Sequence, residues 1–581
     1  MFRPVNILSW EVSVSQETGG VFRVSSNTPL GEFPVRLTDS LEHWATVAPD
    51  RTFLAKRDWS GDWQRLSYGE FRTQARNAAQ WLIDEGVTNP IVILSGNDLE
   101  HAVLGMAAMY AGVPYAPISP AYSLVSSDHA KLRHIFGLLE PDLVFASDGH
   151  AFAKALQAVG PVKVVATRNA PLLFETLIGT PAGSEVDRST AAVSADTVVK
   201  ILFTSGSTGV PKGVINTHRM LCSNQEMLRT VFQFFGETPP VVCDWLPWNH
   251  TFGGNHNFGL VLYNGGTLYV DDGKPAGRAF QETLRNLRDV APTVYFNVPK
   301  GFEALVEALR ADAELRAKFF SRLSMTFYAA AGLSQHIWDA LDELAVETCG
   351  HRIPMLTGLG ATETAPFAIC ANKDTTRAGV VGLPVPGVEL KLVPVEEKLE
   401  VRLRGPNVTP GFWRQPELTR AAFDDEGFYK LGDALRFLDP TDKGKGFLFD
   451  GRIAEDFKLS TGTWVSVGPL RAKFIGHAAP YVRDIVLAGI NQGELTAMIF
   501  PDPDYVPSRE TLQELLRSFA AESTGSSTCI VRAILLEDPP SIDAGEVTDK
   551  GSINQRAVLQ RRAGLVEALY STPVPEIVIS I

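Results

Sequence analysis

Hydrophobic residues recur along this chain in two alternating patterns from Val35 onward. Short apolar runs such as 91–94 are typical of strands buried on both faces of a sheet. Between them lie longer segments whose apolar residues return every three or four positions, the period of an amphipathic helix. One such helix begins at a capping box, Ser67-Tyr68-Gly69-Glu70, and should run to about Glu85. This alternation predicts βαβ units and a mostly parallel sheet.

The same patterns predict the remaining elements. The first 30 or so residues are polar, and we interpret them as an irregular arm over the body. Alternating Val, Leu and Lys residues over 388–403 favour antiparallel strands and therefore a β-rich lobe. Asp98 should cap a helix over 99–110. Strands are predicted at 143–146, 162–166, 241–246, 267–270, 293–297, 484–488 and 497–500, and helices at 281–290, 301–310 and 509–519.

The length of 581 residues implies several domains, because single hydrophobic cores rarely exceed about 250–300 residues. We expect an α/β protein with a large body, residues 1–450, made of two α/β lobes and the β-rich lobe. Residues 452–581 should form a smaller α+β domain, because short strands and one amphipathic helix follow a change of pattern near residue 450.

The balance of charged residues disfavours some classes of binding partner. There are 53 Lys and Arg against 66 Asp and Glu, a net charge of −13, which disfavours general binding to nucleic acid or anionic membranes. A polyanionic ligand would therefore need a local site. Five cysteines without CxxC spacing suggest neither a disulfide framework nor a zinc site. The first 12 residues lack signal-peptide features, and Gly and Pro interrupt the apolar stretch 101–118, so we expect a cytoplasmic protein.

The strongest candidate for chemistry is the segment 201–213, in which an apolar strand runs into hydroxyls, glycines and a lysine. Glycines let backbone N–H groups converge on a phosphate, hydroxyls donate to its oxygens, and a lysine adds positive charge. A flexible Ser/Gly linker would need neither the preceding strand nor the following Pro-Lys-Gly. The P-loop of NTPases is also excluded, because Pro211 stands where its second glycine is required. The candidate phosphate ligands are Thr204, Ser205, Gly206, Ser207, Thr208, Gly209 and Lys212.

This segment resembles the phosphate loop of the adenylate-forming superfamily, which includes acyl-CoA synthetases, luciferases and adenylation domains of peptide synthetases. Further motifs follow in the family's order along nearly the whole chain. The run 358–364 resembles its aromatic-Gly-x-Thr-Glu segment, which implies that Thr362 touches the α-phosphate and Glu363 holds Mg²⁺. Thr208 could also face the metal. Leu359 departs from the family, which usually has an aromatic residue there to stack on adenine.

The resemblance implies further roles. Asp433, in Tyr-Lys-Leu-Gly-Asp, would accept both ribose hydroxyls, and Arg452 would also reach the ribose. Ala331 and Gly332 belong to a small-residue stretch that would lie along adenine. Lys550 would bridge the substrate carboxylate and the α-phosphate.

The smaller domain would act as a mobile lid hinged near Ala454, where the family usually has a polar residue. Its rotation would move Lys550 out and bring the segment 458–462 in for coenzyme A. Whether Lys458 or the turn at Gly462 lines the pantetheine tunnel is left open. His250 lies in a segment that resembles the one between acyl pocket and CoA tunnel. Trp245, Trp248 and Phe252 beside it could wall an aromatic acid or be plain core residues.

Segments 93–101, 114–123, 454–465 and 548–556 resemble the branch that contains feruloyl-CoA synthases. The implied activity is ATP-dependent ligation of a hydroxycinnamic or related aryl acid to CoA through an acyl-adenylate, with Mg²⁺, releasing pyrophosphate and AMP. No nucleic-acid or membrane partner is expected, and a homodimer is left open. The alternatives are a stand-alone adenylation enzyme that loads a carrier protein, a luciferase-like oxygenase, and a non-catalytic ATP-binding sensor.

Overall fold

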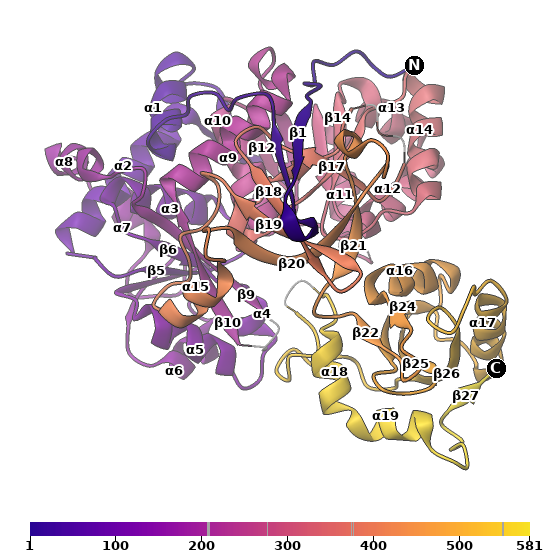
Figure 1. Cartoon of the computed structure of the whole chain (residues 1–581). Coiled ribbons are helices and arrows are strands. Elements are labelled where there is room, and N and C mark those ends of the chain that lie inside the picture. Colours follow the sequence, from indigo (N-terminus) through magenta and orange to yellow (C-terminus); the bar gives the residue numbers. More distant parts are fainter. Residues whose placement is uncertain (206–209, 276, 374, 376, 549–550) are drawn as a thin grey trace.

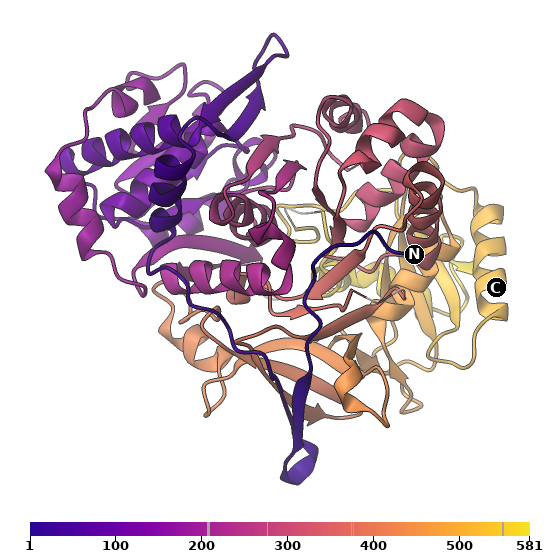
Figure 2. The ribbon, with the colours of Figure 1, turned by 90° about the horizontal axis from the view of Figure 1, so that it is seen from above.

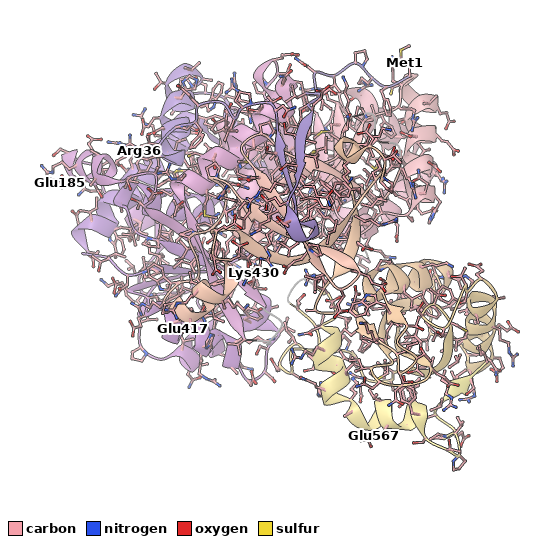
Figure 3. All side chains as sticks on the ribbon, in the orientation of Figure 1. Met1, Arg36, Glu185, Glu417, Lys430 and Glu567 are labelled. Atoms are coloured by element: carbon pink, nitrogen blue, oxygen red, sulfur yellow. The ribbon has the colours of Figure 1, made fainter. Side chains whose placement is uncertain are left out.

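The computed structural model describes residues 1–205, 210–275, 277–373, 375, 377–548 and 551–581. A large body carries a smaller C-terminal unit at one side, drawn in yellow and light orange (Figure 1). Glu417 and Glu567, labelled in Figure 3, mark helix α15 (Pro416–Ala422) of the body and helix α19 (Ala563–Tyr570) of that unit. The arrangement confirms the expected α/β class.

The first lobe of the body is a six-stranded sheet in the order β10-β9-β6-β5-β7-β8. Strands β5 to β9 pair in parallel, as predicted from the strand–helix alternation, whereas β10 returns antiparallel to β9. The capping box at Ser67 is formed and opens α2. The elements are β5 (Ile91–Leu94), β6 (Tyr115–Pro117), β7 (Leu143–Ala146), β8 (Lys163–Ala166), β9 (Val198–Ser205), β10 (Pro211–Thr217), α2 (Tyr68–Asp84) and α3 (Leu99–Ala111).

The prediction that the side chain of Asp98 caps helix α3 is wrong. Asp98 precedes the helix but makes no side-chain capping hydrogen bond. Its Oδ1 instead accepts a hydrogen bond from Nζ of Lys56, at 2.7 Å, and Lys56 comes from strand β3 (Thr52–Arg57). A lysine that is mostly buried requires an opposite charge, and that demand outweighs the local capping preference.

An eleven-stranded sheet joins the second α/β region to the predicted β-rich lobe. Its first strands, β13, β14 and β15, are parallel, and the strands from β16 to β1 are antiparallel to their neighbours. The bounds are β13 (Val294–Asn297), β14 (Met325–Tyr328), β15 (Met355–Leu359), β16 (Ile369–Cys370), β17 (Val380–Pro384), β21 (Phe447–Arg452), β20 (Tyr429–Phe437), β19 (Lys398–Arg404), β18 (Glu389–Val395), β2 (Phe22–Ser26) and β1 (Val12–Gln16).

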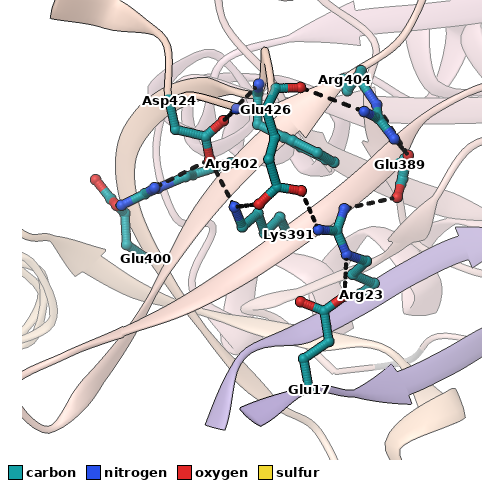
Figure 4. A network of polar contacts seen from close by, with 10 residues as sticks. Glu17, Arg23, Glu389, Lys391, Glu400, Arg402, Arg404, Asp424 and Glu426 are labelled. Carbon is teal, nitrogen blue, oxygen red and sulfur yellow. Dashed lines mark hydrogen bonds and ion pairs between the residues drawn. The ribbon is translucent and has the colours of Figure 1, made fainter. Parts of the chain in front are cut away.

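The prediction of an irregular N-terminal arm is wrong. Strands β1 and β2 form a hairpin, and β2 pairs with β18 to extend the large sheet (Figure 2). Arg23 of β2 is surrounded by three carboxylates, those of Glu17, Glu389 and Glu426, within the ionic network of Figure 4. The network continues through Lys391, Glu400, Arg402, Arg404 and Asp424.

A four-stranded sheet, β11-β12-β3-β4, completes the body. Helix α11 (Phe280–Asp289) and helix α12 (Pro299–Ala311) lie within two residues of their predicted bounds, and α12 packs on α14 (Gln335–Cys349). The other elements used below are β11 (Val241–Asp244), β12 (Thr267–Val270), β4 (Trp63–Ser67), α5 (Ala130–Leu139) and α9 (His218–Val231).

The C-terminal unit has its own sheet, β24-β25-β26-β27, and a two-stranded ribbon, β22-β23. Two of the hydrophobic clusters contain only residues from Phe457 onward, so this unit has a core separate from the body. The domain boundary and the hinge near Ala454 stay predictions. The elements are β22 (Phe457–Lys458), β23 (Trp464–Val465), α16 (Val467–His477), β24 (Val482–Ala488), β25 (Leu495–Pro501), α17 (Arg509–Ala521), β26 (Ile530–Leu535), α18 (Gln555–Arg561) and β27 (Ile579–Ser580).

Candidate active site

The predicted phosphate segment is the hairpin between β9 and β10. Thr204 lies opposite Lys212 in the antiparallel register, and the Lys212 ammonium stands 5.5 Å from the centre of the Phe412 ring. Gly206, Ser207, Thr208 and Gly209 lie outside the described residues, and the side chain of Ser205 is also not described. The hairpin thus brings the first and last predicted phosphate ligands together across one strand pair, and the cradle between them stays a prediction.

The predicted Thr362-Glu363 pair forms a tight turn directly after β15. The turn is the 3₁₀ helix η4 (Thr362–Thr364), and Thr362 is buried. A Cβ on Gly360 would stand 1.6 Å from the carbonyl oxygen of Pro366, so only glycine permits this close approach. The partly buried Glu363 carboxylate lies close enough to Tyr429 on β20 for its negative charge to add to the effect of burial in raising the pKa of the Tyr429 hydroxyl. The turn therefore lies beside strand β20, which also holds Asp433.

Asp433 lies on β20 opposite Arg452 of β21, with 3.5 Å between its Oδ1 and the arginine Nε. Burial raises the pKa of the Asp433 carboxyl to about 6, and the negative charges of Glu455 and Glu363 add to the shift while Arg452 opposes it. Arg452 itself is exposed. The result is a sheltered carboxylate, paired at 3.5 Å with the exposed Arg452, whose acceptor oxygens suit the recognition of two hydroxyl groups.

The small-residue stretch predicted to lie along adenine follows the end of β14. Because β14 and β15 are parallel neighbours, their carboxyl ends meet at one edge of the sheet. Ala330 has a φ of 76°, and Ala331 and Gly332 are exposed beside it. Leu359, at the end of β15, packs against the main hydrophobic cluster and stays partly exposed. The adenine-contacting role of these residues stays a prediction.

The segment around His250 turns back on the end of β11 through a π-helix, η3 (Phe252–Asn257). A Cβ on Gly253 or Gly254 would lie within 2.3 Å of backbone carbonyl oxygens in 246–248, so the turn needs both glycines. Nδ1 of the partly buried His250 accepts from the backbone N–H of Phe252 at 3.3 Å. Trp248 and Phe252 are buried in the main core, whereas Trp245 is partly exposed and donates to Asn297 Oδ1 at 3.2 Å.

Sequence reasoning missed a buried lysine beneath this turn. Lys200 of β9 is 4% exposed, and its Nζ donates to the Gly254 carbonyl at 3.1 Å and to Asn255 Oδ1 at 3.0 Å. Burial lowers the pKa of its amine to about 7. Asn255 also donates to Asn216 of β10 at 2.8 Å. These bonds connect both strands of the phosphate hairpin to the π-helix. A lysine inside an otherwise apolar strand was the available signal.

The C-terminal unit contacts the body on two sides. Lys458 pairs with Glu396 at 2.8 Å in the turn between β18 and β19, and its ammonium lies 5.3 Å from the Trp464 ring. Close to Ala454, the buried Asp456 carboxylate is paired with Lys398 and also accepts from the backbone N–H of Val467 at 2.8 Å. This side of the junction is held by a sheltered ion pair.

The segment before Lys550 rests on the first lobe. The Asp543 carboxylate accepts from the backbone N–H and the hydroxyl of Ser127, at 3.1 and 2.7 Å. Lys131 of α5 donates to the Ile542 carbonyl at 2.6 Å, and His134 of the same helix lies 3.2 Å from the Pro211 carbonyl at the start of β10. Lys550 lies outside the described residues, but the chain leading to it docks next to the phosphate hairpin.

Residues 41–413 match the sequence profile of the AMP-binding enzyme family, so the chain belongs to that family. This confirms the resemblance inferred from the motifs. A probable CoA ligase of Humulus lupulus is 27% identical over 54% of this chain and 50% of its own length. A 3-hydroxybenzoate–CoA/4-hydroxybenzoate–CoA ligase of Thauera aromatica is 26% identical over 63% of this chain and 68% of its own. The chain spans about half the length of the curated relatives it matches first.

The fold matches solved structures over almost their full length. The anthranilate CoA ligase AuaEII in complex with anthranoyl-AMP aligns with a TM-score of 0.72 at 20% identity, covering 94% of this chain and 99% of that one. Within the described ranges, the helices include none long and apolar enough to cross a membrane. Those same ranges contain no group of three or more His, Cys, Asp or Glu side chains placed to hold a metal ion.

Proposed function

We propose that this protein is an AMP-forming acid–CoA ligase that acts on an aryl acid. The observation that carries the proposal is the proximity of the Glu363 carboxylate to both Tyr429 and Asp433, which brings the Thr362-Glu363 turn beside the strand holding Asp433. The two segments are distant in the sequence, and the negative charge of Glu363 adds to the raised pKa of the Asp433 carboxyl, so the two carboxylates repel each other. A nucleotide whose ribose binds Asp433 and whose phosphates lie near Glu363 would explain why the two carboxylates are placed together.

In the first half-reaction, an oxygen of the acid forms a bond to the α-phosphorus of ATP, and the bond from that phosphorus to pyrophosphate breaks. Both reactants are anions, so positioning and charge neutralisation supply the catalysis. Lys212 and Thr204 flank the proposed phosphate loop, Thr362 would donate to the α-phosphate, and Asp433 holds the ribose. Lys550 would bridge the two reacting groups.

A magnesium ion fits the residues that are present. The Glu363 carboxylate is a hard oxygen ligand on a partly exposed turn, of the kind Mg²⁺ takes beside phosphates, and Thr208 would add a hydroxyl. When bound, the ion neutralises phosphate charge. The protein itself fixes the position of Glu363, on the η4 turn beside Tyr429.

In the second half-reaction, the sulfur of coenzyme A attacks the acyl carbon and AMP leaves. The C-terminal unit would rotate about the region of Ala454, withdrawing Lys550 and moving the segment around Lys458 toward the site. We assign the docked posture, with Asp543 on Ser127, to the adenylating step; the assignment is supported by the position of the segment before Lys550 beside the phosphate hairpin. We place this chemistry in the cytoplasm.

A hydroxycinnamate such as ferulate is the proposed acid. Support comes from the segments that resemble feruloyl-CoA synthases and from the aromatic side chains around the π-helix. The named activities of the Thauera hydroxybenzoate ligase and of the anthranilate ligase are in keeping with an aromatic acid.

The test is AMP formation from ATP with ferulate, coumarate, benzoate and octanoate, each with and without CoA. We expect a ferulate-dependent signal that needs CoA for full turnover, together with the absorbance of the thioester. Acid-dependent pyrophosphate exchange that ignores CoA would instead indicate a carrier-protein acceptor. A protein that binds ATP but responds to no acid would contradict the proposal.

A further inference from the structure

The π-helix holds a histidine with one unsatisfied nitrogen. His256 is 1% exposed, and its Nε2 has no hydrogen-bond partner among the described residues. Leaving a buried polar atom unpaired destabilises the fold, and native proteins rarely do so without a reason. Burial lowers the pKa of this imidazole to about 4, so the ring is neutral at ordinary pH and one of its nitrogens must be an acceptor.

The hydrogen bonds behind the ring decide which nitrogen that is. Nδ2 of Asn257 lies 2.8 Å from Oδ2 of Asp244, and an ionised carboxylate can only accept, so the amide nitrogen faces the aspartate. The amide oxygen therefore faces Nδ1 of His256, at 2.8 Å, and needs a donor there. Nδ1 carries the hydrogen, which leaves Nε2 with a free lone pair. The chain of hydrogen bonds from Asp244 through Asn257 to His256 thus fixes Nε2 as a hydrogen-bond acceptor.

Four phenylalanine rings surround this acceptor. The His256 ring centre lies 5.2 to 6.0 Å from those of Phe252, Phe296, Phe327 and Phe367. None of these side chains can donate a hydrogen bond, so a donor to Nε2 has to be either a buried water or a bound ligand. A molecule that fits among such rings is itself aromatic, because the rings favour edge and offset stacking.

The position of the cage connects it to the candidate active site. Phe296 and Phe327 are each the last residue but one in their strands, β13 and β14. Phe367 follows the Thr362-Glu363 turn by four residues. The acceptor thus lies just behind the sheet edge at which Ala331, Gly332 and Glu363 are found. An acid whose carboxylate is activated at this edge would point its aromatic ring toward the cage.

We propose that Nε2 of His256 accepts a hydrogen bond from a phenolic hydroxyl on the acid substrate and so selects hydroxyaryl acids over their unsubstituted and methoxy counterparts. The inference rests on the proposed ligase function and adds the substrate feature that the pocket recognises. A methyl ether offers no hydrogen, and an unsubstituted ring leaves the nitrogen unpaired.

The test compares matched cinnamic and benzoic acids that carry a ring hydroxyl, a methoxy group or hydrogen. Acid-dependent AMP formation is measured at pH 8, above the pKa of about 7 to which burial raises the Asp244 carboxyl. We expect the unmodified protein to favour a hydroxyl acid by about 10- to 100-fold in kcat/KM, the range for one unpaired buried acceptor. His256→Phe should reduce this preference to within about threefold while activity on the unsubstituted acid is retained, because the new ring suits the phenylalanine cage.

The matched control is His218→Phe, a second buried histidine whose Nδ1 accepts from the backbone N–H of Leu37 at 3.1 Å, far from the π-helix in the sequence. It should keep the preference for the hydroxyl acid. Two results would overturn the inference: an unmodified protein that does not discriminate, as expected if a resident water satisfies Nε2, or a preference that survives in His256→Phe. The first result decides the matter even if the variant does not fold. If unsubstituted acids are activated in either case, the ligase proposal stands. If no acid supports AMP formation, both the ligase proposal and the role of His256 are contradicted.

Discussion

Replacing Asp433 with asparagine separates the ligand-binding role of this carboxylate from its effect on folding. The change keeps the size of the side chain and one acceptor oxygen, but it removes the charge. Hydrogen bonds to an ionised group contribute about 1.5–3 kcal/mol each. If Asp433 holds both ribose hydroxyls, the variant should lose about 2–3 kcal/mol in ATP recognition. That corresponds to a decrease of about 30- to 150-fold in kcat/KM for ATP.

Stability should change in the opposite direction. Burial raises the carboxyl pKa from 3.8 to about 6, so the folded protein holds this proton more tightly than the unfolded chain does. The free energy of unfolding therefore falls as pH rises from about 4 to about 6 and stays lower above that. Asparagine removes this loss. At pH 8 we expect Asp433→Asn to be more stable, by up to about 3 kcal/mol, which is the equivalent of the raised pKa.

The pH profile gives a third readout. Ribose binding needs the ionised carboxylate, and at pH 5 only about a tenth of the Asp433 groups are ionised when the pKa is about 6. The kcat/KM for ATP should fall about tenfold between pH 7 and pH 5 in the unmodified protein, and this limb should flatten in the variant.

The assays are pyrophosphate release at varied ATP and urea denaturation at pH 5 and pH 8. Asp425→Asn, a change at an exposed aspartate in the turn before β20, is the matched control and should alter neither quantity. A variant that loses stability and ATP recognition in parallel would refute the reasoning, because Asp433 would then be a structural residue.

Three further changes test the other parts of the site. Lys550→Ala should slow adenylation by about 100- to 1,000-fold yet spare thioester formation from supplied acyl-adenylate, and equal losses in rapid-quench assays of the two half-reactions would contradict the lid assignment. Asp543→Asn should weaken the contact with Ser127 and slow adenylation severalfold relative to thioester formation, with Ser127→Ala giving the same pattern; a uniform loss would argue against a docking role. Lys200→Met should abolish a gain in unfolding free energy between pH 7 and pH 9.5, because a buried amine with a pKa of about 7 binds fewer protons than its unfolded form over that range; a slope retained in urea titrations would show that Lys200 is not its source.

Local sequence patterns determined the elements and most of the candidate residues. Period and capping chemistry placed α2 and the buried strands β5 and β7, since these depend on neighbours within a few positions. The order of the motifs along the chain located Glu363, Asp433 and the strand before the phosphate loop. Turns of these motifs require particular residue types at fixed spacing, so they can be found in the sequence.

Tertiary structure alone decided how those residues act. Pairing between distant strands made the N-terminal segment a hairpin on the large sheet, and a buried lysine drew Asp98 away from its helix. The meeting of Glu363 with Tyr429 depends on how two strands of one sheet are placed, which no local spacing encodes.

The clearest case is His256. From the sequence, this residue is one histidine in a glycine-rich segment. Its tautomer and its free nitrogen follow from Asp244, Asn257 and the phenylalanine rings, which reach it from separate strands and turns. Each buried polar atom needs a partner within hydrogen-bond distance, but which groups lie at that distance depends on how the whole chain packs. For that reason the chain determines its elements residue by residue, and only the packed structure determines which groups stay available for a ligand.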